Sequence, residues 1–217
     1  DRSNNITGEG IDIMLTIDIS GSMLDKDFEP NRLEAAKQTM SQFVQERPND
    51  RLGLVIFAGE SFTQCPVTLD HAVLIQQIGI LTPELLLPGT SIGNGLASAV
   101  NGLRNSTAKS KVIVLMTDGV NQPNEGLNIK PEKAIELANL YNIKVYTIGI
   151  GSKGKALRPM QQPDGTVVDV LTDVEIDEAL LEKIAAATNG KYFRATDNNT
   201  LKNIYKEIDK LEKSKIE

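Results

Sequence analysis

Three oxygen-bearing side chains alternate with other residues in one short segment of the chain. Asp18, Ser20 and Ser22 follow directly after an apolar run over residues 11–17, and Gly21 lies between the two serines. A carboxylate and two hydroxyls are hard oxygen donors, the kind of ligand that Mg²⁺ prefers. Taken alone, the same pattern is equally typical of a helix N-cap and a turn. Its position after a strand therefore matters more than its composition.

Two other segments bring similar side chains to the end of a strand or the start of a helix. Asp118 follows the apolar run over residues 112–117, and Thr90 precedes a helical pattern that begins near Ile92. In an open α/β sheet the carboxyl ends of the strands form the crevice where ligands bind. We therefore expect one metal site at this edge, with Mg²⁺ as the cation and Mn²⁺ or Ca²⁺ as alternatives. Its expected residues are Asp18, Ser20, Ser22, Thr90 and Asp118.

The elements that must position these residues alternate along the chain. Apolar, β-branched runs, typical of strands, cover residues 11–17, 52–57, 111–117, 143–150 and 191–194. Helical patterns follow Asn31 and cover residues 70–78, 92–103, 131–141, 178–188 and 200–211. Strand alternating with helix predicts a doubly wound α/β fold, with a mostly parallel central sheet and helices on both faces. A short antiparallel edge strand is expected at residues 62–64.

We interpret the 217 residues as a single domain. Residues 1–9 are expected to be a lead-in, and residues 198–217 a C-terminal helix. The turn signal Pro163-Asp164-Gly165-Thr166 predicts a β-hairpin insertion over residues 153–176. The sequence begins at Asp1 without a methionine and ends in a charged helical pattern, so we expect a fragment of a longer protein.

Composition excludes some functions and leaves others open. The 29 acidic and 23 basic residues give a net charge of −6, and no dense Lys/Arg stripe with interleaved aromatics is found. Nucleic-acid binding is therefore not expected, because that affinity depends on phosphate neutralisation. Cys65 is the only cysteine, which excludes an intramolecular disulfide but leaves the cellular compartment open.

The site residues resemble a known motif. Asp18-x-Ser20-x-Ser22, with Thr90 and Asp118, is similar to the metal-ion-dependent adhesion site of von Willebrand factor A (VWA) domains. The resemblance implies that the two serines and the threonine contact the cation directly in at least one state, while the two aspartates act directly or through water. It also implies that a protein partner supplies an Asp or Glu carboxylate to the metal. The function it implies is divalent-cation-dependent protein–protein interaction without catalysis.

A narrower resemblance rests on three other segments. Residues 27–37, 87–91 and 190–195 are similar to bacterial aerotolerance (Bat) proteins of the BatA-like type. This resemblance implies that the full-length protein is anchored in the bacterial inner membrane, with this domain in the periplasm or, alternatively, in the cytoplasm. The partners it implies are related VWA proteins or a MoxR-type AAA+ ATPase system.

Two other functions remain as alternatives: a scaffold that the metal only stabilises, and a Mg²⁺-dependent phosphoryl-transfer enzyme. The sequence lacks a phosphate-cradling Gly-Lys-Ser/Thr loop and an evident second metal site. Gly149-x-Gly151-x-x-Gly154 runs into a loop where a dinucleotide-binding fingerprint needs a helix. We interpret Asp25 and Asp27 as a solvated loop, with an auxiliary cation site as the alternative.

Overall fold

The computed structural model of the chain describes residues 10–126 and 128–213. The expected lead-in over residues 1–9 and the last four residues of the expected C-terminal helix lie outside these ranges. A six-stranded sheet forms the centre, in the order β3-β2-β1-β4-β5-β8. Its strands are β1 (Ile11–Asp18), β2 (Arg51–Phe57), β3 (Ser61–Thr68), β4 (Ser110–Thr117), β5 (Ile143–Ile150) and β8 (Tyr192–Ala195). All neighbouring pairs are parallel except β2 and β3.

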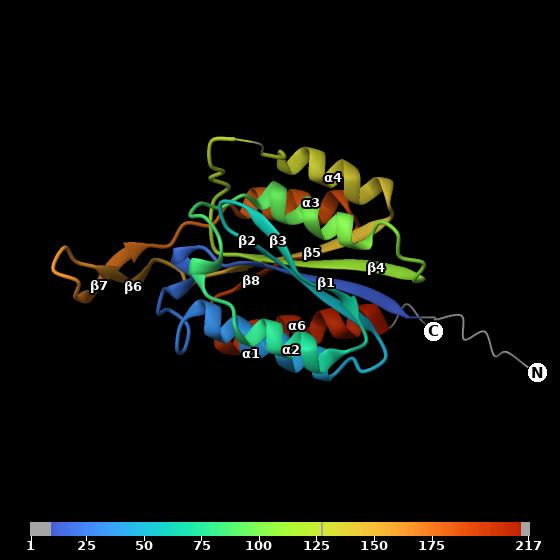
Figure 1. Ribbon diagram of the computed structural model, residues 1–217, viewed down its shortest axis with the longest axis horizontal. Helices are drawn as coiled ribbons and strands as arrows, with labels where there is room; N and C mark the ends of the chain where they lie inside the picture. Colours follow the sequence, from blue (N-terminus) through green and yellow to red (C-terminus); the bar gives the residue numbers. More distant parts are fainter. Residues whose placement is uncertain (1–9, 127, 214–217) are drawn as a thin grey trace, which may run out of the picture.

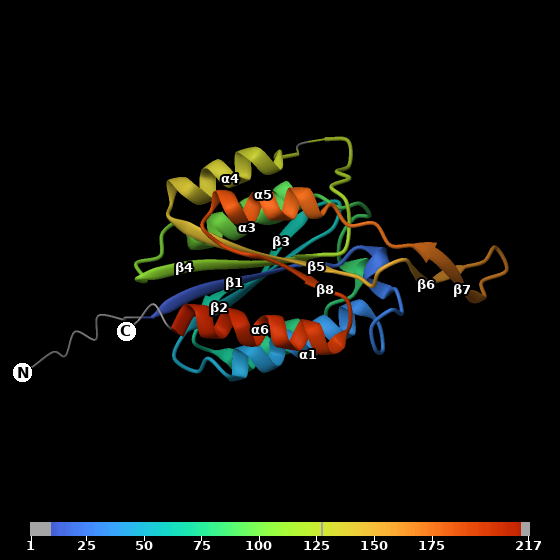
Figure 2. The same cartoon turned by 180° about the vertical axis from the view of Figure 1, so that it is seen from behind.

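Helices cover both faces of this sheet (Figures 1 and 2). On one face lie α1 (Arg32–Gln45), α2 (His71–Gly79) and α6 (Asn198–Lys213), and on the other α3 (Ile92–Leu103), α4 (Pro131–Leu140) and α5 (Glu178–Ala187). Two short 3₁₀ helices, η1 (Gly21–Leu24) and η2 (Pro83–Leu85), lie in loops. The predicted doubly wound, mostly parallel α/β sheet with an antiparallel edge strand is confirmed.

The two faces bury different side chains of the same strands. In β1, Ile13, Leu15 and Ile17 pack with one core cluster, while Met14 packs with the other. Side chains alternate between the faces of a strand, so a strand that is covered on both sides must be apolar at nearly every position. This is why the central strands are continuous apolar runs in the sequence.

The antiparallel edge strand is longer than expected. β3 covers eight residues, whereas only residues 62–64 were expected from the sequence. Its pairing with β2 shifts register on both sides of Leu54, which indicates a bulge or irregularity, and Pro66 lies inside the strand. Proline and irregular pairing are tolerated at a sheet edge because one side of the strand needs no partner. The alternation that identifies a strand in a sequence is weakened by the same features.

A two-stranded hairpin projects from the end of the molecule where β1 and β4 terminate (Figure 1). It consists of β6 (Lys155–Gln161) and β7 (Val167–Asp173), which pair antiparallel with each other and not with the main sheet. The turn between them contains Gly165 at a positive φ of 86°. The Pro-Asp-Gly-Thr signal thus lies at a turn.

Candidate metal centre

Asp18 ends β1 and is fully buried at the carboxyl edge of the sheet. One of its carboxylate oxygens accepts a hydrogen bond from the backbone N–H of Ser20 at 2.8 Å. The other accepts from the hydroxyl of Thr117, at the end of the adjacent strand β4, also at 2.8 Å. The carboxylate is thus held rigidly between two strand ends.

The serine hydroxyls and Asp118 form a continuous chain of oxygen atoms beside Asp18. Ser20 Oγ lies 3.1 Å from Ser22 Oγ, and Ser22 Oγ donates to Asp118 Oδ1 at 2.9 Å. Ser22 lies in η1 and Asp118 follows β4, so residues 96 positions apart in the chain meet here. The turn after β1 and the turn after β4 therefore meet, as expected because the carboxyl ends of parallel strands lie at one edge of the sheet.

Thr90 comes from a third loop and lies next to this chain of oxygens. Its backbone forms a two-hydrogen-bond bridge with Gln122, with N···O distances of 3.0 and 2.8 Å. A Cβ atom at Gly119 would lie 3.9 Å from Thr90 Oγ1, so the threonine hydroxyl is close to the residue that follows Asp118. Ser91 caps α3 by accepting from Asn94, which positions Thr90 at the mouth of the site. All five expected residues are thus brought to one edge.

Two carboxylates buried side by side are electrostatically unfavourable on their own. Burial raises the pKa of Asp18, and burial together with repulsion from Asp18 raises the pKa of Asp118 well above its usual range. The neighbouring Arg32 and the hydrogen bond from the Ser22 hydroxyl act in the opposite direction and lower the pKa of Asp118. A bound cation would favour the ionised form of both carboxylates. The electrostatics therefore favour occupation of this edge by a cation.

Asp25 and Asp27 are not the solvated loop residues that we expected. The Asp25 carboxylate accepts hydrogen bonds from Nε and Nη2 of Arg158, at 2.7 and 3.0 Å. The Asp27 carboxylate accepts hydrogen bonds from Nε and Nη2 of Arg32, at 2.6 and 2.7 Å. Their side chains are 1% and 4% exposed, and the Arg32 side chain is 2% exposed. Arg32 also donates to Asp118 at 2.9 Å.

This buried network was missed because its partners are far apart in sequence. Arg32 directly follows Asn31, which caps α1 as expected by accepting from Glu34 at 2.8 Å. A positive charge in the first turn of a helix is unfavourable because the N-terminal end of the helix dipole is also positive. An arginine at this position is therefore a weak signal that carboxylates lie nearby. That feature could have marked Arg32 as a residue with buried acidic partners.

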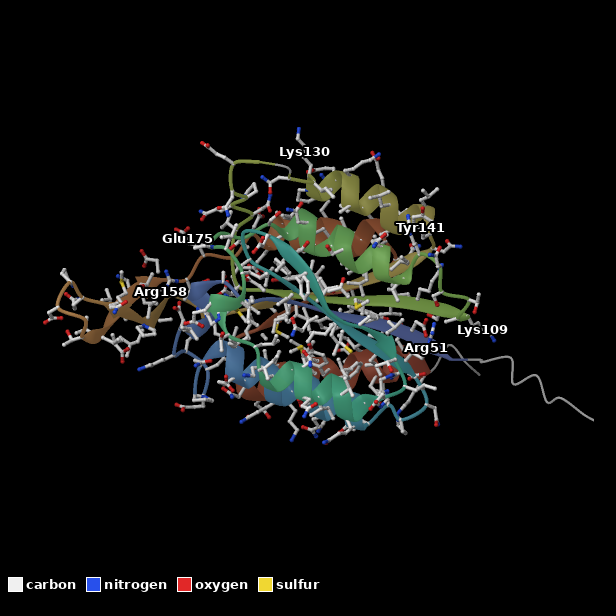
Figure 3. The ribbon with its side chains drawn as sticks, viewed as in Figure 1. Arg51, Lys109, Lys130, Tyr141, Arg158 and Glu175 are labelled. Carbon is white, nitrogen blue, oxygen red and sulfur yellow. The ribbon has the colours of Figure 1, made fainter. Side chains whose placement is uncertain are left out.

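A cavity of about 350 Å³ opens beside the five expected residues. Ser22, Thr90 and Asp118 line its inner wall, and Arg158 and Glu175 lie on the side of the hairpin (Figure 3). Ser20 is 8% exposed and is not one of the residues that line the cavity. A ligand atom that enters the cavity can therefore reach the two hydroxyls and the carboxylate of the inner wall.

The donor set fits a hard cation bound through few protein ligands. Within residues 10–126 and 128–213, no group of three or more His, Cys, Asp or Glu side chains that could hold a metal is found. The site instead offers two carboxylates and three hydroxyls, without nitrogen or sulfur. Such a set suits Mg²⁺, which retains water molecules and rarely occupies a site built only from protein ligands. Thiolate and imidazole ligands, which Zn²⁺ prefers, are absent from these five positions.

Comparison with known proteins agrees with this arrangement. Residues 12–207 match the model of the von Willebrand factor type A domain family. An uncharacterized protein of Borreliella burgdorferi is 32% identical over 190 residues, which cover 87% of this chain and 55% of that protein. The chain therefore spans little more than half the length of that relative.

Two solved structures from Bacteroides resemble this fold along most of its length. An aerotolerance-related membrane protein of Bacteroides fragilis is 31% identical, with a TM-score of 0.75, and the match covers 91% of this chain and 98% of that one. A conserved hypothetical protein of Bacteroides thetaiotaomicron, BatB, is also 31% identical with a TM-score of 0.75, and the match covers 94% and 100%. Among the described residues, no helix has the length and apolar character needed to cross a membrane. By family model, fold and sequence identity, the chain belongs to the von Willebrand factor type A domain family and is related to the bacterial aerotolerance proteins.

Proposed function

We propose that this chain is a divalent-cation-dependent protein-interaction module. In this proposal Ser20, Ser22 and Thr90 bind Mg²⁺ directly, with Asp18 and Asp118 directly or through water. The observation that carries the proposal is the pair of buried carboxylates, which adjoins two hydroxyls at the wall of an open cavity. The metal, when bound, supplies a Lewis-acidic coordination position that faces the cavity.

The chain's own residues orient the site and leave room for one external ligand. Thr117 and the Ser20 N–H occupy both oxygens of Asp18, which keeps that carboxylate from rotating. Arg32 occupies one oxygen of Asp118, and the other faces Ser22. Neutral hydroxyl ligands leave positive charge on the cation, so a carboxylate from outside is a favourable additional ligand. A protein partner with an exposed Asp or Glu fits this chemistry.

The metal site is tested by calorimetric titration with Mg²⁺ and Mn²⁺. The wild type is expected to bind one cation, and Ser20→Ala combined with Ser22→Ala is expected to weaken binding by at least about tenfold. The matched control is Ser106→Ala, which removes a hydroxyl that donates to a different buried aspartate, Asp12, at 2.5 Å. Equal metal binding by the double variant and the control would show that these hydroxyls are not ligands.

The partner's role is tested with the proteins that the family resemblance suggests. The full-length protein is expected in the bacterial inner membrane, with related VWA proteins or a MoxR-type AAA+ ATPase system as partners. Each is measured for binding in Mg²⁺ and in EDTA, followed by alanine substitution of the partner's acidic residues. We expect binding that requires Mg²⁺ and one acidic residue. Binding that persists in EDTA would indicate that the metal only stabilises a scaffold.

A further inference from the structure

The root of the hairpin forms one wall of the cavity beside the candidate metal centre. Arg158 of β6 and Thr172 of β7 line the same cavity as Ser22, Thr90 and Asp118. Arg158 is held there by its two hydrogen bonds to buried Asp25 (Figure 3 labels Arg158). A partner side chain that enters this cavity therefore lies beside the root of the hairpin.

One face of the hairpin continues outward from the cavity wall as an apolar strip. Arg158 pairs with Val170, and Met160 pairs with Val168, so these four side chains share the face that Thr172 occupies at the root. Met160, Val168 and Val170, here called the apolar strip, are 46%, 41% and 38% exposed. The strip extends roughly 13 Å from Thr172, four residues along an extended strand. Contiguous exposed apolar side chains on a projecting element are typical of an interaction surface.

The outer edge of β7 is an open strand edge. Gln162 donates to Thr166 at 2.7 Å, and the alternation from this pair turns the backbone groups of Val167, Asp169 and Leu171 outward. The opposite edge, on β6, is partly covered because Leu157 accepts from the N–H of Lys26 at 2.8 Å. β7 has no second neighbour in the described sheets. Its outward N–H and C=O groups are therefore available to pair with an added strand.

The charged side chains of the two strands β6 and β7 are paired within the molecule, Arg158 with Asp25 as described above. Asp169 forms an ion pair with Lys26 at 2.9 Å, and Asp173 with Lys155 at 3.7 Å. What the hairpin offers a partner is therefore an open backbone edge and an apolar strip, rather than net charge. The cavity at its root offers the opposite chemistry, a site suited to a cation and a carboxylate.

We propose that the partner binds as an extended segment that adds a strand to the outer edge of β7. In this mode one Asp or Glu of the segment enters the cavity toward the metal, and alternate apolar side chains lie on Met160, Val168 and Val170. This inference rests on the proposed function, because the acidic anchor needs the cation. Backbone pairing gives affinity in strand addition, and pockets or strips for alternate side chains give specificity.

The test uses synthetic fluorescent peptides as probes, with one Asp placed before or after an alternating Val/Thr run. The spacing between the Asp and the first Val is varied over about one to five residues, which covers the length of the strip. Fluorescence polarisation in Mg²⁺ is compared for wild type, Val168→Thr/Val170→Thr, and the matched control Val167→Thr/Leu171→Thr on the opposite face. Threonine is β-branched, as strands prefer, so the hairpin should persist in both variants.

We expect at least one spacing to bind, with about tenfold loss in Val168→Thr/Val170→Thr and less than about twofold loss in the control. Replacing Asp by Asn, or placing proline at alternate positions of the peptide, should also reduce binding, because proline removes the N–H that pairs with the edge. Mg²⁺ binding, measured separately by calorimetry, should be unchanged in both variants.

Several results would overturn the inference, and they are distinguishable from failure of the proposed function. If the wild type does not bind Mg²⁺, the proposed function fails, and this inference fails with it. If Mg²⁺ binds but no peptide does, if both faces matter equally, or if proline peptides bind as well, the strand-addition mode is wrong while the metal site stands. Self-association, or flotation with phosphatidylcholine vesicles, that Val168→Thr/Val170→Thr abolishes would assign the strip to a second copy or a membrane instead.

Discussion

Strand β1 carries a buried aspartate near each end, and only one of the two, Asp12, has a cationic side chain as partner among the described residues. Asp12, at the amino end, is 2% exposed. Its carboxylate accepts hydrogen bonds from two nitrogens of the Arg51 guanidinium and from the Ser106 hydroxyl. Asp18, at the carboxyl end, is fully buried, yet among the described residues it forms no ion pair with a cationic side chain. Its carboxylate accepts hydrogen bonds from the Ser20 N–H and the Thr117 hydroxyl, which are neutral groups.

The difference supports the proposal that Asp12 has a structural role and that Asp18 belongs to a cation site. An unpaired charge in the interior costs several kcal/mol, so folded proteins normally neutralise it. Arg51 neutralises Asp12 through an ion pair. Asp18 has no such partner among the described residues, and a second carboxylate, Asp118, lies beside it. The same strand thus contains one carboxylate with an internal counter-charge and one that, in our proposal, takes part in a cation site.

The largest expected effect is on metal binding by Asp18→Asn. This change removes the charge but retains the shape, and we expect at least about a hundredfold loss of Mg²⁺ affinity, or ~2.7 kcal/mol. Asp12→Asn is the matched control and should bind Mg²⁺ like the wild type. Calorimetric titration with Mg²⁺ measures the affinity of both variants. A similar loss of Mg²⁺ affinity in both would contradict the proposed difference between Asp12 and Asp18.

The second expected effect is on the free energy of unfolding, where substitution of Asp12 should matter more than substitution of Asp18. Asp12→Ala leaves Arg51 without its partner, and we expect a loss of about 2 kcal/mol in the free energy of unfolding, reduced because Arg51 is half-exposed. Asp18→Asn, measured in EDTA, should lose much less, since it removes an unneutralised buried charge. Urea unfolding in EDTA provides the measurement, and a greater loss in Asp18→Asn would contradict the comparison.

The third prediction concerns pH. The pKa values of Asp18 and Asp118 are raised in the metal-free fold, so between about pH 4 and the raised values the folded state binds more protons than the unfolded state. Stability contributed by these groups in EDTA therefore falls as pH rises through that window. Mg²⁺ favours the ionised carboxylates, so its stabilising effect should increase over the same range.

Thermal unfolding with and without saturating Mg²⁺ tests this at about pH 5.5 and about pH 8. We expect a larger Mg²⁺-dependent rise in Tm at the higher pH, with roughly 3 °C for each kcal/mol in a domain of this size. Asp18→Asn should show little Mg²⁺ dependence at either pH. A rise that is independent of pH in the wild type would place the cation away from these carboxylates.

The smallest expected effect comes from Thr90→Ala. One neutral hydroxyl ligand contributes about 0.5–1.5 kcal/mol, so we expect partner or peptide binding to weaken by roughly threefold to tenfold while Mg²⁺ still binds. Thr39→Ala, which removes a hydroxyl bonded to the Ala35 carbonyl on α1, is the control. Wild-type partner affinity in Thr90→Ala would exclude this hydroxyl from the site.

Much of the fold was predictable because its signals are local. The continuous apolar runs of β4 and β5 arise from burial on both faces, and Asn31 and Asp70 cap α1 and α2 as their positions indicate. The general rule for parallel sheets then places the residues after β1 and β4 at one edge. The extent of β3 was not predictable, since an irregular edge strand carries little alternation.

The loops that meet at the edge of the sheet could be predicted from the amino-acid sequence alone, and with them the five candidate ligands: Asp18, Ser20, Ser22, Thr90 and Asp118. Which charges are neutralised by an ion pair became visible only in the folded chain. Asp25 and Arg158 are 133 positions apart, and Arg32 and Asp118 are 86 apart. Whether an acidic residue is solvated or buried depends on which distant segments pack around it, and no local pattern records that. For the same physical reason, only the folded chain showed that Asp12 has an internal counter-charge and Asp18 does not.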